Sequence, residues 1–238
     1  MKILPGTVYL TGAGPGDPDL LTRRALQLLQ SADVILHDDL VSQAVLAEAR
    51  AAAEVINVGK RCGHKRITQQ EIHAMLIAQA RAGRIVVRLK SGDPLIFGRA
   101  GEEIRALRQA EVPFAVVPGV TAALAAAAAA GFSMTDRGGA SRLVLESGHH
   151  AEEREEAEQH GHRSTTLARY MPGSDYAGMQ RELVDKGWSA GTPVLLVSCA
   201  GQPGQQTKRL RLGELAEAEP LPAPTILLVG EAIAMAAD

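Results

Sequence analysis

Short apolar runs that alternate with helical stretches constrain the fold more than any other feature of this sequence. In the first half, β-prone runs end at turns rich in glycine, proline or polar residues, and residues at helical spacing follow them. These runs occupy residues 8–11, 34–36, 55–58, 85–89 and 114–117. Because parallel strands need a crossover connection, strands that alternate with helices indicate parallel pairing. The pattern predicts an α/β domain whose sheet is largely parallel.

The helices of this half are marked by apolar spacing and by capping residues. Apolar residues recur at helical spacing between Leu20 and Leu29, and a second helical stretch is predicted over residues 42–53. Thr68 is placed to cap a helix that runs to Ala82, with Glu71 three residues later completing a capping box. A further helix is predicted over residues 99–109.

The second half has longer connections between its elements. Residues 121–130 form an alanine-rich helix, and a helix over residues 176–186 ends before Gly187, a good C-terminal cap. Strands are predicted at residues 142–145, 165–170, 194–197 and 225–229. The longer connections indicate a mixed sheet. With a boundary near Pro118 and Gly119, the sequence predicts two α/β domains, residues 1–118 and 119–238.

Composition excludes several classes of protein. The two cysteines, Cys62 and Cys199, lack paired spacing, so reduced thiols in a cytoplasmic protein are expected. The first residues lack the apolar stretch of a signal peptide. The longest apolar run, Ala122 to Ala130, is too short for a bilayer core of about 30 Å. A net charge of −2 argues against nucleic acid as a partner. Neither a membrane nor a nucleic acid is therefore expected as a partner.

The most concentrated basic stretch is Lys60 to Arg66. It lies in the half of the chain where Lys and Arg outnumber Asp and Glu. It has two interpretations, a solvated surface loop or a landing site for a polyanionic ligand. The residues alone leave both open.

A glycine-rich turn follows the first strand, at residues 12–17, and fails as a dinucleotide fingerprint. The third glycine of the GxGxxG pattern would fall on Asp17, which puts a negative charge where a pyrophosphate would lie. Pro15 also removes a backbone N–H donor from this turn. The residues disfavour a nicotinamide or phosphate site and are equally those of a tight turn.

Three further stretches are candidates for ligand contacts. Residues 91–99 follow a buried strand at the carboxyl edge of the sheet, where Asp93 could accept hydrogen bonds from ribose hydroxyls or an amino group. A simple turn is the alternative for this stretch. In the other two stretches, the alternative for Thr121 is a helix cap, and a pair such as Tyr170 and Met171 more often packs in a core than contacts a cofactor.

Taken in order, these motifs resemble the tetrapyrrole methyltransferases. The matching stretches are GAGPGDPDLLT, VGKRCGHK, RLKSGDPLIFGR, VVPGVTAALAAAAAAG and LARYMPG. The resemblance covers essentially the whole chain and is weakest over residues 146–164 and 198–223. It implies a homodimer of two-domain α/β subunits that binds S-adenosylmethionine in a cleft between the domains and releases S-adenosylhomocysteine. The second and third motifs further imply methylation of uroporphyrinogen III at carbons 2 and 7, which gives precorrin-2.

The resemblance also implies a set of site residues. Those of the cofactor site are Pro15, Ser91, Gly92, Asp93, Ile96, Thr121, Ala122, Met171, Leu195 and Thr225. Those of the substrate site are Leu40, Lys60, Arg61, Lys65 and Phe97, with Asp38 and Arg99 as catalytic residues. Asp38 is expected to orient the substrate or to accept a proton. Arg99 and the basic stretch are expected to meet carboxylates of the macrocycle, since arginine binds carboxylates in a bidentate manner.

Three positions depart from the family pattern. Ser91 and Asp39 stand where glycine and arginine are usual, and Glu146 stands where an uncharged residue is usual. Four histidines between residues 149 and 162 surround an acidic run, but their spacing fits no standard ligand set, so no metal is expected. The alternatives left open are a methylase that acts on a later corrin intermediate, a nucleotide-dependent oxidoreductase, and a tetrapyrrole carrier without catalysis.

Overall fold

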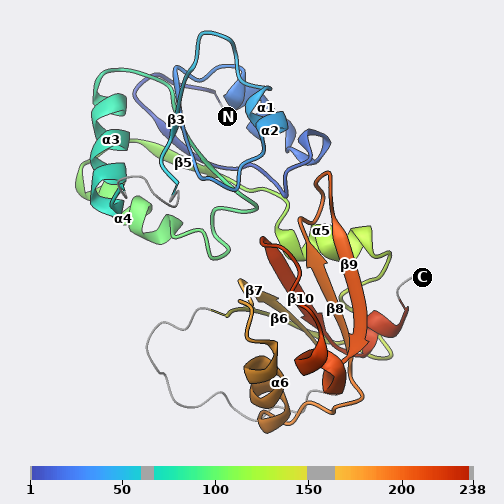
Figure 1. The fold of residues 1–238 in the computed structure, drawn as a ribbon. Helices are drawn as coiled ribbons and strands as arrows, with labels where there is room; N and C mark the ends of the chain where they lie inside the picture. Colours follow the sequence, from blue (N-terminus) through green and yellow to red (C-terminus); the bar gives the residue numbers. More distant parts are fainter. Residues whose placement is uncertain (1, 60–66, 149–163, 236–238) are drawn as a thin grey trace. The chain divides into compact units, whose positions relative to one another are not determined.

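The computed structural model of this protein describes residues 2–59, 67–148 and 164–235 (Figure 1). The chain separates into two compact units, residues 1–121 and 122–238. This division lies three residues after the predicted boundary, and the roles assigned to the two domains stay predictions. No helix in the described ranges is long and apolar enough to span a bilayer.

The first unit contains a sheet of five parallel strands in the order β3-β2-β4-β1-β5. Its strands are β1 (Val8–Gly12), β2 (Val34–His37), β3 (Glu54–Asn57), β4 (Val86–Lys90) and β5 (Phe114–Val117). The parallel sheet predicted from the alternating pattern is therefore confirmed. Because every strand runs in the same direction, the loops that follow the strands gather at one edge of the sheet.

Helices cover both faces of this sheet (Figure 1). They are α1 (Arg23–Leu29), α2 (Gln43–Leu46), α3 (Gln69–Arg81) and α4 (Ala100–Gln109). Side chains alternate along β1, so Leu10 packs with the core residues of α3 and α4, while Tyr9 packs with those of α1 and α2. The predicted capping box is present at the start of α3, where Thr68 and Glu71 each accept the other's backbone N–H.

The helix predicted over residues 42–53 is much shorter in the structure. Ser42 caps α2, but the helix ends at Leu46 and the following residues form turns. In these turns the backbone N–H of Arg50 donates to Leu29, and its side chain donates to the carbonyl of Ala32. These tertiary hydrogen bonds outweigh the intrinsic helix preference of the alanines.

The second unit contains a mixed sheet in the order β6-β7-β10-β8-β9. Its strands are β6 (Arg142–Ser147), β7 (Thr165–Tyr170), β8 (Pro193–Ser198), β9 (Gln206–Arg211) and β10 (Thr225–Val229). Only β6 and β7 pair in parallel among these strands, and the other three pairings are antiparallel. The predicted mixed sheet is confirmed. Among the described residues, the α-helices of this unit are α5 (Ala122–Ala129) and α6 (Tyr176–Asp185), and short 3-10 helices occupy Leu212–Glu217 and Glu231–Met235.

A buried arginine joins β7 to its neighbours in the second unit. The Arg169 side chain is only 4% exposed, and it forms ion pairs with Glu146 on β6 and with Glu182 on α6. Glu182 also accepts a hydrogen bond from Lys186 at 2.5 Å. The unusual charge at Glu146 therefore has a structural explanation, because it neutralises part of a buried guanidinium.

Glu182 makes the stability of this unit depend on pH. Burial disfavours its charged form, but hydrogen bonds from Arg169 and Lys186 outweigh burial and lower the pKa of Glu182 from 4.5 to about 2. Because the folded-state pKa is lowered, the stabilisation is present above pH 4.5 and is lost as the pH falls towards 2. We expect Glu182→Gln to lower the free energy of unfolding by about 1–2 kcal/mol at pH 7. Urea denaturation at a series of pH values measures this difference.

The exposed Glu217→Gln is the control, because it removes the same charge from the same unit. It should change stability little at any pH. A difference between Glu182→Gln and wild type that persists unchanged down to pH 2 would contradict the linkage argument.

Candidate functional site

A pocket of about 650 Å³ opens in the first unit at the carboxyl edge of the parallel sheet. The loops after β2 and β3, the end of β4 and the start of α3 line it. Its volume lies in the range of small-molecule sites. Four residues predicted from the sequence, Asp38, Leu40, Phe97 and Arg99, lie in its wall. The structure therefore brings both predicted catalytic residues into one cavity.

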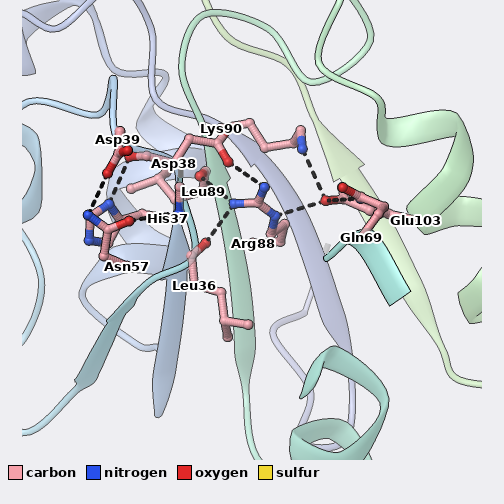
Figure 2. A network of polar contacts seen from close by, with 11 residues as sticks. Leu36, His37, Asp38, Asp39, Asn57, Gln69, Arg88, Leu89, Lys90 and Glu103 are labelled. Atoms are coloured by element: carbon pink, nitrogen blue, oxygen red, sulfur yellow. Dashed lines mark hydrogen bonds and ion pairs between the residues drawn. The ribbon is translucent and has the colours of Figure 1, made fainter. Parts of the chain in front are cut away.

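Asp38 forms an ion pair with Arg88, which also lies in the pocket wall (Figure 2). The Arg88 side chain is 3% exposed, and its Nη1 also donates to the carbonyls of Leu36 and Leu89, at 3.3 Å each. Burial opposes the charge of Arg88, but Asp38 and Glu103 outweigh it and raise the pKa of Arg88 above its usual value. Arg88 is thus a permanent cation that orients the Asp38 carboxylate.

Asp39 departs from the family pattern and contributes to the shape of the pocket wall. Its Oδ1 accepts a hydrogen bond from Asn57 Nδ2 at 2.7 Å, and Asn57 Oδ1 accepts the backbone N–H of Gly59 at 2.8 Å. A Cβ at Gly59 would lie 2.4 Å from the backbone nitrogen of Asp39, so the two loops touch closely. The aspartate therefore holds the loop after β2 against the loop after β3.

Arg99 also lies in the wall, next to strained backbone. Phe97 and Arg99 have φ values of 52° and 56°, in the left-handed region that costs energy for residues other than glycine. The Arg99 guanidinium donates to both carboxylate oxygens of Glu102 at 2.8 Å. This hydrogen bonding raises the pKa of Arg99, so the side chain serves as a cation and not as a base.

The charges of the described pocket lining balance. The acids are Asp38, Asp39 and Glu102, and the bases are Arg88, Lys90 and Arg99. The predicted substrate residues Lys60, Arg61 and Lys65 lie outside the described residues. Within the described lining there is no excess positive charge for a polyanion, so any such excess has to come from elsewhere in the chain.

Three glycines meet where the loops after β1, β4 and β5 converge, beside the predicted cofactor residues. Gly14 and Gly92 exchange backbone hydrogen bonds of 3.2 and 2.8 Å. A Cβ at Gly119 would lie 2.3 Å from the carbonyl oxygen of Gly92, and a Cβ at Gly12 would lie 2.6 Å from the same atom. We call Gly12, Gly92 and Gly119 the glycine junction. Because its backbones leave no room for side chains, the three loops can pack this closely only with glycine at each position.

Asp93 organises the glycine junction. Its Oδ2 accepts the backbone N–H of Gly119 at 3.0 Å, and its Oδ1 accepts that of Leu95 at 2.8 Å. The sequence predicted that Asp93 binds a ribose or amino group. The structure adds a second, structural role, because the same carboxylate joins the loop after β4 to the loop after β5 through its hydrogen bond with Gly119.

Replacement of Asp93 tests its predicted role in cofactor binding together with its structural role in the glycine junction. Asp93→Ala leaves the Gly119 N–H without its acceptor, so we expect affinity for S-adenosylhomocysteine to fall by at least about tenfold. Asp93→Asn keeps an oxygen acceptor and should lose less. Isothermal titration calorimetry measures both affinities. Wild-type affinity in Asp93→Ala would remove this carboxylate from the predicted cofactor site.

The remaining cofactor predictions are divided between the two units. Pro15, Ser91, Ile96 and Thr121 lie in the first unit, in or beside the loops of the glycine junction. In the second unit, the hydroxyl of Tyr170 accepts the backbone N–H of Ala123 at 3.3 Å, so the start of α5 at Ala122 is tied to the end of β7.

Met171, directly after β7, has a φ of 49° and an exposed side chain. Leu195 is fully buried in β8 and offers no exposed surface. Thr225 begins β10, where its hydroxyl donates to the carbonyl of Pro222 at 2.9 Å. The placement of Met171 agrees with a ligand contact more readily than that of Leu195.

Sequence reasoning missed the buried charges behind the pocket. Arg88 and Lys90 are two residues apart on β4, so they point to the same face, and both are bonded to the buried carboxylate of Glu103 on α4. The available signal was a pair of basic residues at a spacing of two inside an otherwise apolar strand. Charged side chains are rarely buried unless they are paired, so that pattern predicts a buried acid nearby.

Comparison with known proteins identifies the family. Residues 7–216 match the family described as Tetrapyrrole (Corrin/Porphyrin) Methylases. This chain belongs to the tetrapyrrole methylase family. The resemblance inferred from the motifs and the predicted fold class are both confirmed.

Among other tetrapyrrole methylases, a relative called uroporphyrinogen-III C-methyltransferase, from Paracoccus denitrificans (strain Pd 1222), is 46% identical over 98% of this chain and 83% of its own. A siroheme synthase from Hahella chejuensis (strain KCTC 2396) is 44% identical over 97% of this chain, which spans only 50% of that protein. A solved uroporphyrin-III C-methyl transferase of Thermus thermophilus, complexed with S-adenyl homocysteine, is 40% identical with a TM-score of 0.82. That comparison covers 96% of this chain and 99% of the solved one.

Proposed function

We propose that this tetrapyrrole methylase transfers methyl groups from S-adenosylmethionine to carbons 2 and 7 of uroporphyrinogen III, giving precorrin-2. The observation that carries the proposal is the placement of Asp38 and Arg99 in one pocket, beside the loops that lead to the glycine junction. The 46% identity to a uroporphyrinogen-III C-methyltransferase over nearly the whole chain supports this choice of substrate.

The glycine junction fits the cofactor. Its three loops pack backbone to backbone, which needs glycine at each position. A sulfonium compound needs no phosphate cradle, so Pro15 is tolerated in the first loop. Residues of these loops, with Asp93, would hold S-adenosylmethionine, and the cofactor contact of Met171 stays a prediction from the resemblance. When bound, the cofactor supplies a methyl group on a positively charged sulfur, which an electron-rich carbon of the macrocycle attacks while the carbon–sulfur bond breaks.

The residues of the pocket would hold the macrocycle. The carboxylates of the macrocycle would bind Arg99, Lys90 and the basic stretch of residues 60–66. That stretch would then be a binding site for a polyanionic ligand and not only a solvated loop. Alignment of the two reactants would account for most of the rate enhancement. Asp38, held by Arg88, would face the ring, orient it and accept the proton that the alkylated macrocycle releases.

An anaerobic incubation with uroporphyrinogen III and S-adenosylmethionine tests the proposal. We expect mass spectrometry to show the product with two added methyl groups, and two molecules of S-adenosylhomocysteine released for each molecule of product. Binding of the substrate without any gain of methyl groups would instead favour the carrier. Methylation of a later corrin intermediate only would favour the other methylase.

Thermal shift separates the remaining alternative. S-adenosylhomocysteine should raise the melting temperature and NAD should not, whereas the reverse result would favour an oxidoreductase. The homodimer and the cytoplasmic location implied by the family are also proposals, and sedimentation velocity of the purified protein tests the first.

A further inference from the structure

Glu103 is a fully buried carboxylate at one end of the polar network behind the pocket (Figure 2). It lies on α4, and its Oε1 accepts hydrogen bonds from Arg88 Nε at 2.9 Å and Lys90 Nζ at 3.0 Å. Gln69 on α3 approaches the same oxygen at 3.4 Å. Arg88 and Lys90 belong to the pocket lining, whereas Glu103 lies behind them. The carboxylate therefore acts on the pocket through the two bases.

The position of Glu103 resolves an electrostatic conflict. Arg88 and Lys90 point to the same face of β4, and both side chains are 3% exposed, so each base disfavours the charge of the other. Burial lowers the pKa of Lys90, and the neighbouring Arg88 lowers it further. Glu103 and, to a smaller extent, Asp38 oppose this lowering. Among the described residues, Glu103 is the carboxylate that contacts both bases.

The same contacts fix the geometry of Asp38. Arg88 directs Nε to Glu103, Nη1 to two backbone carbonyls and Nη2 to Asp38, so its planar guanidinium is held on three sides. Without the hydrogen bond from Nε to Glu103, the guanidinium could rotate, and Nη2 would no longer be held towards Asp38. An ammonium has three N–H bonds, and Glu103 accepts one from Lys90, which leaves donors for an anionic group in the pocket.

We propose that Glu103 is a positioning residue, which holds Arg88 and Lys90 in place, keeps Lys90 charged for a substrate carboxylate, and through Arg88 orients Asp38. The inference deepens the proposed function and rests on it for its kinetic consequence. Glu103 itself reaches neither the pocket nor the substrate. Its effect is therefore separable from that of the residues it holds.

The charge of Lys90 can be followed directly without substrate. The chain has six lysines, at positions 2, 60, 65, 90, 186 and 208, so an NMR titration of ¹³C-labelled lysine side chains gives few signals. Lys90→Arg removes one of them and assigns it. We expect Glu103→Gln to move the titration midpoint of Lys90 downwards by about one pH unit or more, because the ion pair is lost.

Two variants separate charge from position. Glu103→Asp keeps the charge but shortens the side chain, so the Lys90 midpoint should stay near that of wild type. In both variants we expect the KM for uroporphyrinogen III to rise and kcat to fall, each by about tenfold. If Glu103→Gln fails to fold, Glu103→Asp still tests the positioning, since a purely structural role leaves its kcat and KM unchanged.

Glu182→Gln is the matched control. Glu182 also accepts hydrogen bonds from a buried arginine and from a lysine, but it lies in the second unit and outside the pocket lining. It should lower stability without moving the Lys90 midpoint, kcat or KM. A similar kinetic loss in Glu182→Gln would overturn the inference, because the effect would then reflect general destabilisation.

The outcomes distinguish this inference from the proposed function. An unchanged Lys90 midpoint in folded Glu103→Gln overturns the inference, and so does wild-type turnover in Glu103→Asp. A wild-type protein that methylates no tetrapyrrole refutes the proposed function, while the Lys90 titration still decides whether Glu103 maintains the charge.

Discussion

Replacement of Asp38 by asparagine is expected to lower kcat/KM for uroporphyrinogen III by about 10²- to 10⁴-fold, the range typical of a lost acid–base group. The asparagine has the same shape and keeps an oxygen towards Arg88, so the pocket should survive. It has lost the negative charge and the ability to take up a proton. Affinity for S-adenosylhomocysteine should remain that of wild type, because the Asp38 carboxylate bonds to Arg88 and not to the glycine junction. Steady-state kinetics and calorimetry measure the two effects.

Asp39→Asn is the matched control for this result. Asp39 is the adjacent residue, lines the same pocket and would lose the same charge, but its carboxylate bonds to Asn57. A much smaller loss of turnover is expected from it. Equal losses in the two variants would mean that the pocket responds to its total charge, and Asp38 would then have no special role.

Replacement of Gly119 by alanine is expected to disable the glycine junction. The added Cβ would lie 2.3 Å from the Gly92 carbonyl oxygen and 2.9 Å from the Gly12 Cα, and both are backbone atoms. Neither can rotate away, so the three loops have to separate. Overpacking of this kind costs about 1–3 kcal/mol or more, and the upper part of that range is expected here. Binding of S-adenosylhomocysteine should become undetectable by calorimetry, and urea denaturation measures the loss of stability.

Gly101→Ala provides the comparison, since Gly101 lies on α4 and its new Cβ would meet only Arg105 Nη1, at an ordinary 3.6 Å. Alanine favours helix more than glycine does, so stability should stay unchanged or rise slightly. If Gly119→Ala binds S-adenosylhomocysteine like wild type, the glycine junction is not part of the cofactor site.

Sequence patterns predict this fold well where an element carries its own signal. The first strands are apolar because parallel sheets are covered on both faces, and the start of α3 is given by Thr68 and Glu71 alone. The strand β9 was missed because it lies at the edge of its sheet, where its side chains are largely exposed and polar. The early end of α2 was missed because it depends on hydrogen bonds between distant residues such as Arg50 and Leu29.

The candidate site was predictable in its members but not in its interactions. Asp38 and Arg99 were chosen from motifs, and the structure places both in one pocket. The ion-pair partner of Asp38 lies on a different element: Arg88 is fifty positions away, and no periodicity links the two. Glu103 is next to Glu102 in the sequence, and only the orientation of α4 makes one carboxylate buried and the other exposed to the pocket. Which of the two carboxylates is buried depends on how α4 packs against the sheet, and a single sequence does not contain this information.

The strand order of the first unit also has a consequence for synthesis on the ribosome. The strand β1 is made first among the five, yet it lies inside the sheet, where Val8 pairs with Val86 on β4 and with Phe114 on β5. Pairings between such distant residues form slowly, and an apolar strand without neighbours is prone to aggregate or to bind chaperones. The nascent chain therefore has to keep β1 unpaired until most of the unit has been translated. The sheet is joined when β4 pairs with both β2 and β1, and β5 is the last strand added, at the edge beside β1.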